Sequence, residues 1–230
     1  MKKNAQTVCL FSILSFSLFA DNSIDSLKQL LLSEREDTNK VIHLYNLCWE
    51  YQNISSYDTA FYYGDSALQV AKQLNYSKGI ANTYNNIGNI YSNQGNYDKA
   101  LENFFAAFKL YEEIGYKKGL ASSYNRIGGI YYTQGNYDKS IENHFAALKI
   151  RKEIGDKKDI ASSYINIGTV YEKQHNYNKA LENYFTALKI IEEMSDKKSI
   201  AMVYINIGTA YTAKSNYTEA ITYLQKGLHL

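Results

Sequence analysis

Asparagine recurs in this sequence at a spacing that could bind a polypeptide. Equivalent places forty residues apart hold Asn46, Asn86, Arg126, Asn166 and Asn206, and four more asparagines surround the second of these: Asn82, Asn85, Asn89 and Asn93. An amide side chain both donates and accepts hydrogen bonds, so a row of them can hold the backbone of an extended peptide without reading its sequence. Arg126 interrupts the row and could meet a carboxylate of the ligand. A second interpretation stays open, in which each asparagine bonds to a neighbouring helix and no ligand is involved.

The histidines do not form a catalytic or metal-binding set. The four of them, His43, His144, His175 and His229, lie in different copies and at different repeat positions, so a zinc site is unsupported. His144 stands where Phe104 and Tyr184 stand in neighbouring copies, which indicates a packed core residue. The sequence has neither of the glycine-rich phosphate-binding motifs, GxxxxGK[ST] or GxGxxG. We therefore predict no catalytic residue, no metal, no cofactor and no enzymatic activity.

Hydrophobic periodicity predicts the elements that position these asparagines. With Ala81 as position 1, position 4 is tyrosine or leucine, position 7 is isoleucine or leucine, and position 11 is always tyrosine. Position 8 is small in every copy: Cys48, Gly88, Gly128, Gly168 and Gly208. Positions 4, 7, 8 and 11 share one side of a helix. The small residue is expected to let a neighbouring helix approach closely, which makes Cys48 a buried small residue and not a nucleophile.

A second helix follows in each copy. Gly95 and Gly135 can end the first helix in a left-handed turn. The next helix then begins after an asparagine N-cap, and it carries alanines and an aromatic residue on its packing face. The N-cap asparagines are Asn96, Asn136, Asn176 and Asn216, and Asp156 and Asp196 can cap the first helices that follow.

The order of an aromatic residue, Ile-Gly, Tyr, Gly-x-Tyr, Ala, an aromatic residue and Ala resembles the tetratricopeptide repeat. The resemblance covers about residues 40–230 in five copies, with a period of forty in place of the commoner 34. It is similar to the long-repeat branch, which includes kinesin light chains and the sensor regions of bacterial signalling proteins such as sensor histidine kinases. The resemblance implies an all-α fold, an α-solenoid of stacked antiparallel helix pairs that form a right-handed superhelix. It also implies that the first helices line an inner groove.

Positions 2, 5, 6, 9 and 13 lie opposite the core positions, and we call these the inner face. The asparagines named above belong to it, which is similar to the asparagine ladder of a kinesin-light-chain groove. The resemblance therefore implies that a protein or an extended peptide is the partner. A clamp for a terminal carboxylate would need lysine at positions 2 and 5, and none of the five copies has one there.

The N-terminus has the layout of a secretory signal peptide. Lys2 and Lys3 precede an apolar run from Val8 to Phe19, which is too short for a membrane span. We expect residues 1–20 to be this signal and residues 21–39 to form a capping helix and a linker. The solenoid is expected over residues 40–230, with repeats near 40–79, 80–119, 120–159, 160–199 and 200–230. The signal predicts an exported protein, periplasmic or otherwise extracytoplasmic.

Charge argues against nucleic acid as the partner. Without Lys2 and Lys3 the chain keeps 23 of its 25 basic residues, against 23 acidic ones. A nucleic-acid-binding protein needs a basic face, and this balance supplies no excess of positive charge.

Three functions remain open. The first is an exported peptide- or protein-binding module that forms the input region of a signal-transduction protein. The second is the regulatory front part of an enzyme, a histidine kinase or a nucleotide cyclase, with its catalytic domain beyond residue 230. The third is an envelope assembly scaffold. The last copy stops about three residues short of the second-helix length seen earlier. This favours a further, membrane-tethered part, while self-association through this end and a tolerated bare end stay open.

Overall fold

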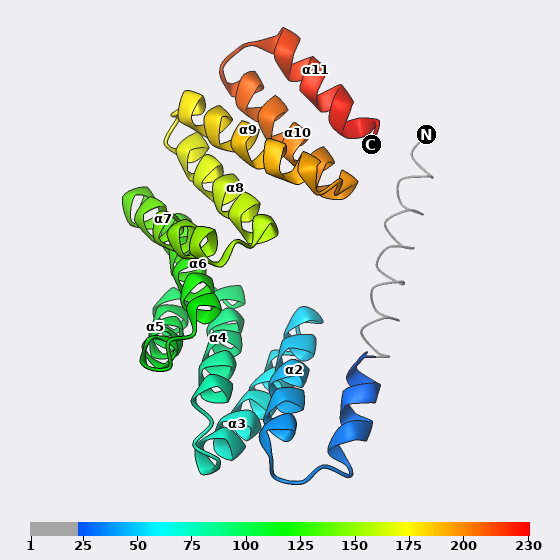
Figure 1. Cartoon of the computed structure of the whole chain (residues 1–230), viewed down its shortest axis with the longest axis vertical. Coiled ribbons are helices and arrows are strands. Elements are labelled where there is room, and N and C mark those ends of the chain that lie inside the picture. The colour runs from blue at the N-terminus through cyan, green and yellow to red at the C-terminus, as the bar shows by residue number, and fades with distance from the viewer. Residues whose placement is uncertain (1–22) are drawn as a thin grey trace. The chain divides into compact units, whose positions relative to one another are not determined.

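The fold is a series of antiparallel helix pairs (Figure 1). The computed structural model describes residues 23–230, so the expected signal peptide lies outside the described residues. A short helix at residues 23–31 precedes ten longer ones. These are α2 (Thr38–Asn53), α3 (Tyr57–Gln73), α4 (Ser77–Asn93), α5 (Tyr97–Glu113), α6 (Lys117–Thr133), α7 (Tyr137–Ile154), α8 (Lys157–Lys173), α9 (Tyr177–Glu193), α10 (Lys197–Ala213) and α11 (Tyr217–Leu228). The described residues contain no strand, and the predicted all-α fold of stacked helix pairs is confirmed.

The chain divides into two compact units at Gly115 and Tyr116. In the first unit α2 pairs with α3 and α4 pairs with α5, and α4 also packs on both α2 and α3. The helix at residues 23–31 contacts α2, because the Ser23 hydroxyl donates to Glu50 Oε1 at 3.0 Å and Lys28 Nζ lies 5.4 Å from the centre of the Tyr51 ring. In the second unit the pairs are α6–α7, α8–α9 and α10–α11, and consecutive pairs pack through α7 on α8 and α9 on α10.

The turn inside each pair is built from one repeated set of backbone bonds. The N–H of the capping asparagine donates to the carbonyl of the tyrosine at position 11, at 2.8 Å from Asn96 to Tyr91 and again from Asn136 to Tyr131. The residue before the asparagine is left-handed, with φ of +75° at Gly95. This is the Schellman ending of a helix, which satisfies carbonyls that would otherwise be orphaned. His175 takes the same conformation at φ +58° without being glycine.

Side-chain caps start most of the helices as predicted. The carboxamide oxygens of Asn96, Asn136 and Asn176 each accept from a backbone N–H three residues on, and Asp156 and Asp196 do the same. Asn216 stands at the N-cap of α11 but forms no side-chain cap bond. The lysine three residues after each of the first three asparagines lies over the ring of the position-11 tyrosine, as Lys139 does over Tyr131 at 5.2 Å. Such cation–π contacts hold the start of the second helix against the end of the first.

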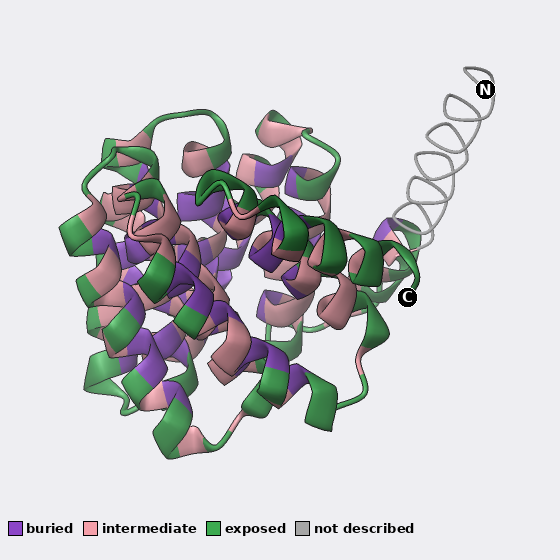
Figure 2. Ribbon diagram, turned by 90° about the horizontal axis from the view of Figure 1, so that it is seen from above, coloured by how far each residue is buried: buried purple, intermediate pink, exposed green. Residues whose placement is uncertain are grey.

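The core of each pair is an interlock of one small and one large residue. A β-carbon added at Gly88 would lie 2.6 Å from the Phe104 ring, and one at Gly168 would lie 2.6 Å from the Tyr184 ring. The first pair differs, because both positions are small: the first helix carries Cys48 and the second carries Gly64. A β-carbon added at Gly64 would lie 3.2 Å from Ile87 Cγ1 of α4 and 3.3 Å from Cys48 Sγ. Cys48 is fully buried as predicted, and burial raises the pKa of its thiol to about 12. Figure 2 shows the buried residues along the sides where helices meet.

Replacing Gly168 with alanine is expected to destabilise the second unit by about 1–3 kcal/mol, because the added carbon overpacks against the Tyr184 ring and the Ala180 carbonyl, 3.2 Å away. Gly129→Ala is the matched control, since nothing lies within 4 Å of its added carbon. Alanine should raise stability there by about 1 kcal/mol through helix propensity. Urea unfolding followed by circular dichroism checks both. Equal stability of the two variants would contradict the interlock.

Candidate functional site

In the first unit the inner-face asparagines are largely engaged with the fold itself. The Asn86 amide donates to the backbone carbonyl of Tyr45 at 2.7 Å and so ties α4 to α2. The Asn85 amide donates to the Tyr111 hydroxyl at 3.1 Å, and that hydroxyl donates to Asn82 Oδ1 at 2.6 Å, which ties α5 to α4. Asn85 and Asn89 are only 6% and 8% exposed, whereas Asn46 is partly buried and Asn93 is exposed.

In the second unit an equivalent bond ties α8 to α6. The Asn166 amide donates to Asn125 Oδ1 at 2.8 Å. Arg126 and Asn206 are partly buried. The side chain of Asn206 forms no hydrogen bond within the described part of the chain.

Of the two interpretations that the sequence left open, the structural bond is therefore present at Asn86 and Asn166. Ligand contact stays a prediction. The two roles are compatible, because a primary amide has two N–H donors and one carbonyl acceptor. The bond from Asn86 to Tyr45 and the bond from Asn166 to Asn125 each use a single N–H.

A cavity of about 300 Å³ opens beside this ladder in the second unit. Its walls come from three helices, with Asn125, Gly129 and Tyr132 from α6, His144 from α7, and Asn166, Thr169 and Val170 from α8. Only Asn166 among these was predicted as a site residue. Two of the others, Gly129 and His144, could have been suspected from the sequence, because each differs from the residues at its equivalent positions in the other copies.

His144 is buried as predicted, at 4% exposure. Its Nδ1 has no hydrogen-bond partner among the described residues, and neither does the hydroxyl of Ser140 one turn earlier on α7. Burial lowers the pKa of His144 to about 4, and the positive charge of Arg151 adds to this effect. Arg151 is itself held by the Asp159 carbonyl at 3.1 Å and the Ser163 hydroxyl at 2.8 Å. The imidazole is therefore neutral at physiological pH.

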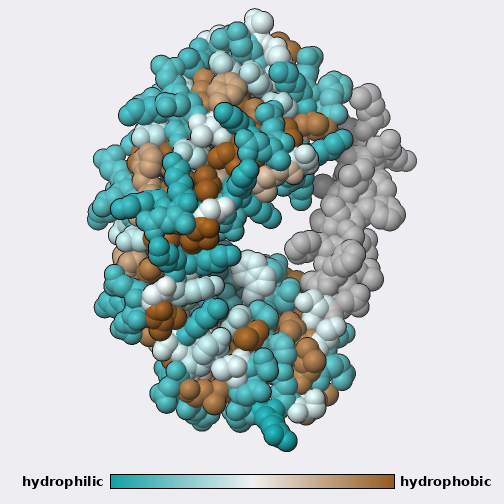
Figure 3. Space-filling view, in the orientation of Figure 1, coloured by the Kyte–Doolittle hydropathy of each residue, from teal (hydrophilic) through white to brown (hydrophobic). Residues whose placement is uncertain are grey.

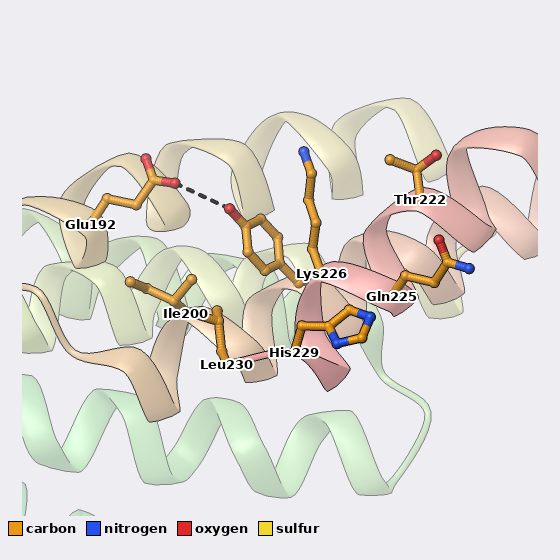
Figure 4. Close-up of a pocket in the computed structure, with 8 residues that line it drawn as sticks. Glu192, Ile200, Thr222, Gln225, Lys226, His229 and Leu230 are labelled. Atoms are coloured by element: carbon orange, nitrogen blue, oxygen red, sulfur yellow. Dashed lines mark hydrogen bonds between the residues drawn. The ribbon is translucent and has the colours of Figure 1, made fainter.

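A second cavity, of about 590 Å³, lies at the last helix pair (Figure 4). It is lined by residues from the end of α9, from α10 and from α11, including the last two residues of the chain, His229 and Leu230. The Tyr204 hydroxyl donates to Glu192 Oε1 at 3.4 Å along one side. Helix α11 has 12 residues where the other second helices have 17 or 18, so this cavity is bounded by a shorter helix.

The charged side chains fit structural roles. Lys117 and Lys157, which begin first helices, pair with Glu153 at 2.8 Å and Glu193 at 2.9 Å within the second unit. These partners lower the pKa of both glutamates. The face seen in Figure 3 is hydrophilic over most of its area, with separate hydrophobic patches. Over residues 23–230 no cluster of three His, Cys, Asp or Glu could hold a metal ion, and no described helix is both long enough and apolar enough to span a bilayer.

Comparisons with known proteins identify the repeat. Models of the tetratricopeptide repeat match residues 81–113, 119–193 and 159–230, which together span more than half of the chain. A comparison with curated proteins finds no match by sequence.

Solved structures show the same fold at low identity. BtubC (BKLC) from P. vanneervenii is 20% identical with a TM-score of 0.76, over 92% of this chain and 88% of that one. PH0952 of Pyrococcus horikoshii, a signal transduction ATPase with a tetratricopeptide repeat sensor, is also 20% identical with a TM-score of 0.76. This chain covers 32% of that protein, and 90% of this chain is matched. A Rap protein complexed with competence and sporulation factor is 15% identical with a TM-score of 0.76, over 97% of this chain and 72% of that one.

The stability of the second unit should depend on pH through His144. Its pKa is about 4 in the folded chain and about 6.5 when unfolded, so the unfolded state binds the extra proton between these values. Stability should therefore rise from pH 4 to about 6.5 and be lower at pH 4 by about 3 kcal/mol. His144→Phe, which copies Phe104, should flatten this part of the profile. Urea midpoints of both proteins at several pH values give the difference, in which other titrating groups cancel. Parallel profiles would contradict the buried neutral imidazole.

Proposed function

Because the chain belongs to the tetratricopeptide repeat family, as the sequence resemblance predicted, we propose that it binds an extended peptide or a segment of a partner protein on the inner face of its first helices. One observation carries the proposal: an inner-face amide of one first helix bonds to the neighbouring first helix in each unit, Asn86 to the Tyr45 carbonyl and Asn166 to Asn125 Oδ1. A partner strand lying across such a row would meet donors and acceptors at each helix it crosses.

The chemistry of the inner face suits a peptide backbone. Each amide offers a donor and an acceptor, as each peptide unit does. One such bond contributes about 0.5–1.5 kcal/mol net, so several are needed for useful affinity. The amides are already oriented by bonds to the fold, and pre-oriented groups lose less entropy on binding. We propose that the chain acts by binding and not by catalysis, with a protein or peptide partner and without nucleic acid, metal or cofactor.

We further propose that the module is exported and forms the input region of a signal-transduction protein. The layout of residues 1–20 supports export. The likeness to a part of PH0952, a protein described as having a tetratricopeptide repeat sensor, and to a Rap protein complexed with competence and sporulation factor supports a sensing role. A histidine kinase or nucleotide cyclase beyond residue 230, a membrane tether, self-association and an envelope scaffold stay as alternatives.

The inner-face asparagines give two matched variants in the second unit. A random dodecapeptide library displayed on phage is selected against the full chain, and the affinity of an enriched peptide is measured by fluorescence anisotropy. Asn206→Ala should weaken binding by about three- to ten-fold without changing stability, since Asn206 has no bond to the described fold. Asn166→Ala should weaken binding similarly and also lower the free energy of unfolding by about 1 kcal/mol, because it breaks the bond to Asn125. If no peptide were enriched, or if the affinity were unchanged in both variants, peptide binding on this face would be contradicted.

Export can be measured with alkaline phosphatase fused after Leu230 in a bacterial host, since this reporter needs disulfides that form outside the cytoplasm. Ile13→Arg breaks the apolar run of the expected signal and should reduce reporter activity about ten-fold or more. Leu30→Arg is the control, because Leu30 is exposed and lies after the signal. Equal activity of the Ile13→Arg and Leu30→Arg fusions would sink the proposal of export.

A further inference from the structure

We propose that the cavity between α6, α7 and α8 is a specificity pocket that receives one uncharged side chain with a hydrogen-bonding tip, tyrosine above all, from the bound peptide. The inference rests on the proposed peptide-binding function. The inner-face amides alone would contact only the backbone of a peptide, and the cavity adds a preference for one side chain. Asn166 belongs both to the ladder and to the wall of the cavity. A peptide held by the ladder therefore passes this cavity.

The cavity exists because two residues break the repeat at the same place. Position 9 of the first helix is Trp49, Asn89, Thr169 and Thr209 in the other copies, but Gly129 here. Nothing lies within 4 Å of a β-carbon added at Gly129, so the space that a side chain fills elsewhere is open. On the second helix, His144 is smaller than the rings of Phe104 and Tyr184 in the two neighbouring copies, while the outer copies have Gly64 and Leu224. Each neighbouring copy carries larger side chains at both of these positions.

The cavity has an unsatisfied polar group at its base. His144 is 4% exposed, and its Nδ1 has no partner among the described side chains. A buried polar atom without a partner costs about 1–3 kcal/mol, so such atoms are rare without a functional reason. A neutral imidazole has one donor and one acceptor nitrogen, and which is which depends on the tautomer. A hydroxyl both donates and accepts, so the phenol of tyrosine can satisfy either tautomer.

The lining also excludes charged side chains. None of the seven residues that line the cavity is an aspartate, glutamate, lysine or arginine, and a desolvated charge without a partner is costly. The positive charge of Arg151, which acts on His144, further disfavours a cation. Tyr132 and Val170 supply apolar wall, which suits the ring of a tyrosine.

In the fourth repeat, a tyrosine of the chain itself occupies the position equivalent to His144. Tyr184 stands where His144 stands, and its hydroxyl donates to Glu172 Oε2 at 2.8 Å and lies 3.3 Å from Thr169 Oγ1. Thr169 is also a wall of the cavity. In the third repeat the smaller imidazole of His144 stands in place of this ring, and the hydroxyl that Tyr184 provides in the fourth is missing. A tyrosine of the ligand would supply a hydroxyl from outside.

The test uses N-acetyltyrosinamide and N-acetylphenylalaninamide as probes, titrated into the ¹⁵N-labelled protein and followed by backbone amide shifts. We expect the tyrosine probe to shift the amides of Gly129, His144 and Thr169, and the phenylalanine probe to bind about five-fold more weakly for lack of the hydroxyl. Gly129→Thr, which copies the fourth and fifth repeats, should abolish both sets of shifts by filling the cavity. His144→Phe should remove the preference between the two probes.

A control and a contrary outcome complete the experiment. Ala146→Thr also copies the fourth repeat, on α7 but away from the residues that line the cavity, and should bind as the native protein does. Circular dichroism confirms that each variant is folded. Equal binding of the two probes to the native protein, binding that survives Gly129→Thr, or no shifts up to the solubility limit would each overturn the pocket.

The phage-selected peptides separate this proposal from the one it rests on. Enriched peptides that contain a tyrosine and lose affinity in Gly129→Thr support both. Enriched peptides without tyrosine, with affinity unchanged in Gly129→Thr, overturn the pocket and leave peptide binding standing. If no peptide is enriched but the tyrosine probe binds in a Gly129-dependent way, the pocket stands as a small-ligand site and peptide binding falls.

Discussion

The close approach of the two helices in each pair is the constraint on which the other features depend. A glycine at position 8 removes the one β-carbon that would keep the ring of the second helix away, as Gly88 does for Phe104 and Gly168 for Tyr184. The helix gives up about 1 kcal/mol of propensity at each such glycine and gains a large buried ring in return. With the pair fixed in this way, the opposite side of the first helix is held steady, and that side carries the amides of the inner face. In the pair of α6 and α7 the ring is the smaller imidazole of His144, and the space beside Gly129 is open.

Within each unit, the pairs share one framework but are joined by different contacts. Tyr111 and Arg151 stand forty residues apart at the same repeat position. The first binds back to Asn82 and Asn85 of its own pair, while the second reaches forward to Asp159 and Ser163 of the next pair. Ion pairs such as Lys117 with Glu153 add exposed links, which contribute little each. A buried arginine is tolerated only when its donors are hydrogen-bonded. The bonds of Arg151 to Asp159 and Ser163 therefore favour α8 as the helix that packs on α7.

Periodicity was sufficient to predict the helix pairs, their turns and most of their caps, because these depend on residues that recur in register. Gly95, Asn96 and Tyr91 act through local backbone bonds, and local bonds can be inferred from spacing alone. The bond of Asn85 to Tyr111 and the burial of Asn89 could not be inferred. Both depend on tertiary packing, which spacing along one helix does not determine. The cavity could not be predicted from the shared pattern, because it depends on side chains that one copy lacks. Gly129 and His144 were visible as departures, but only the packing shows that their two gaps meet.

The two small residues that meet in the first helix pair, Cys48 and Gly64, affect how such a chain can fold. Copies this similar compete for one another's partners, and exchanging like elements is a typical failure of repeat proteins. Helix α2 presents Cys48 where the later first helices present glycine, and α3 presents Gly64 where the others present a ring. If α2 took the place of α4 beside α5, the Cys48 sulfur would strike the Phe104 ring. If α3 took the place of α5 beside α4, Gly64 and Gly88 would face each other across a void. This difference gives the first repeat an identity of its own and disfavours exchange of its helices with those of the second repeat.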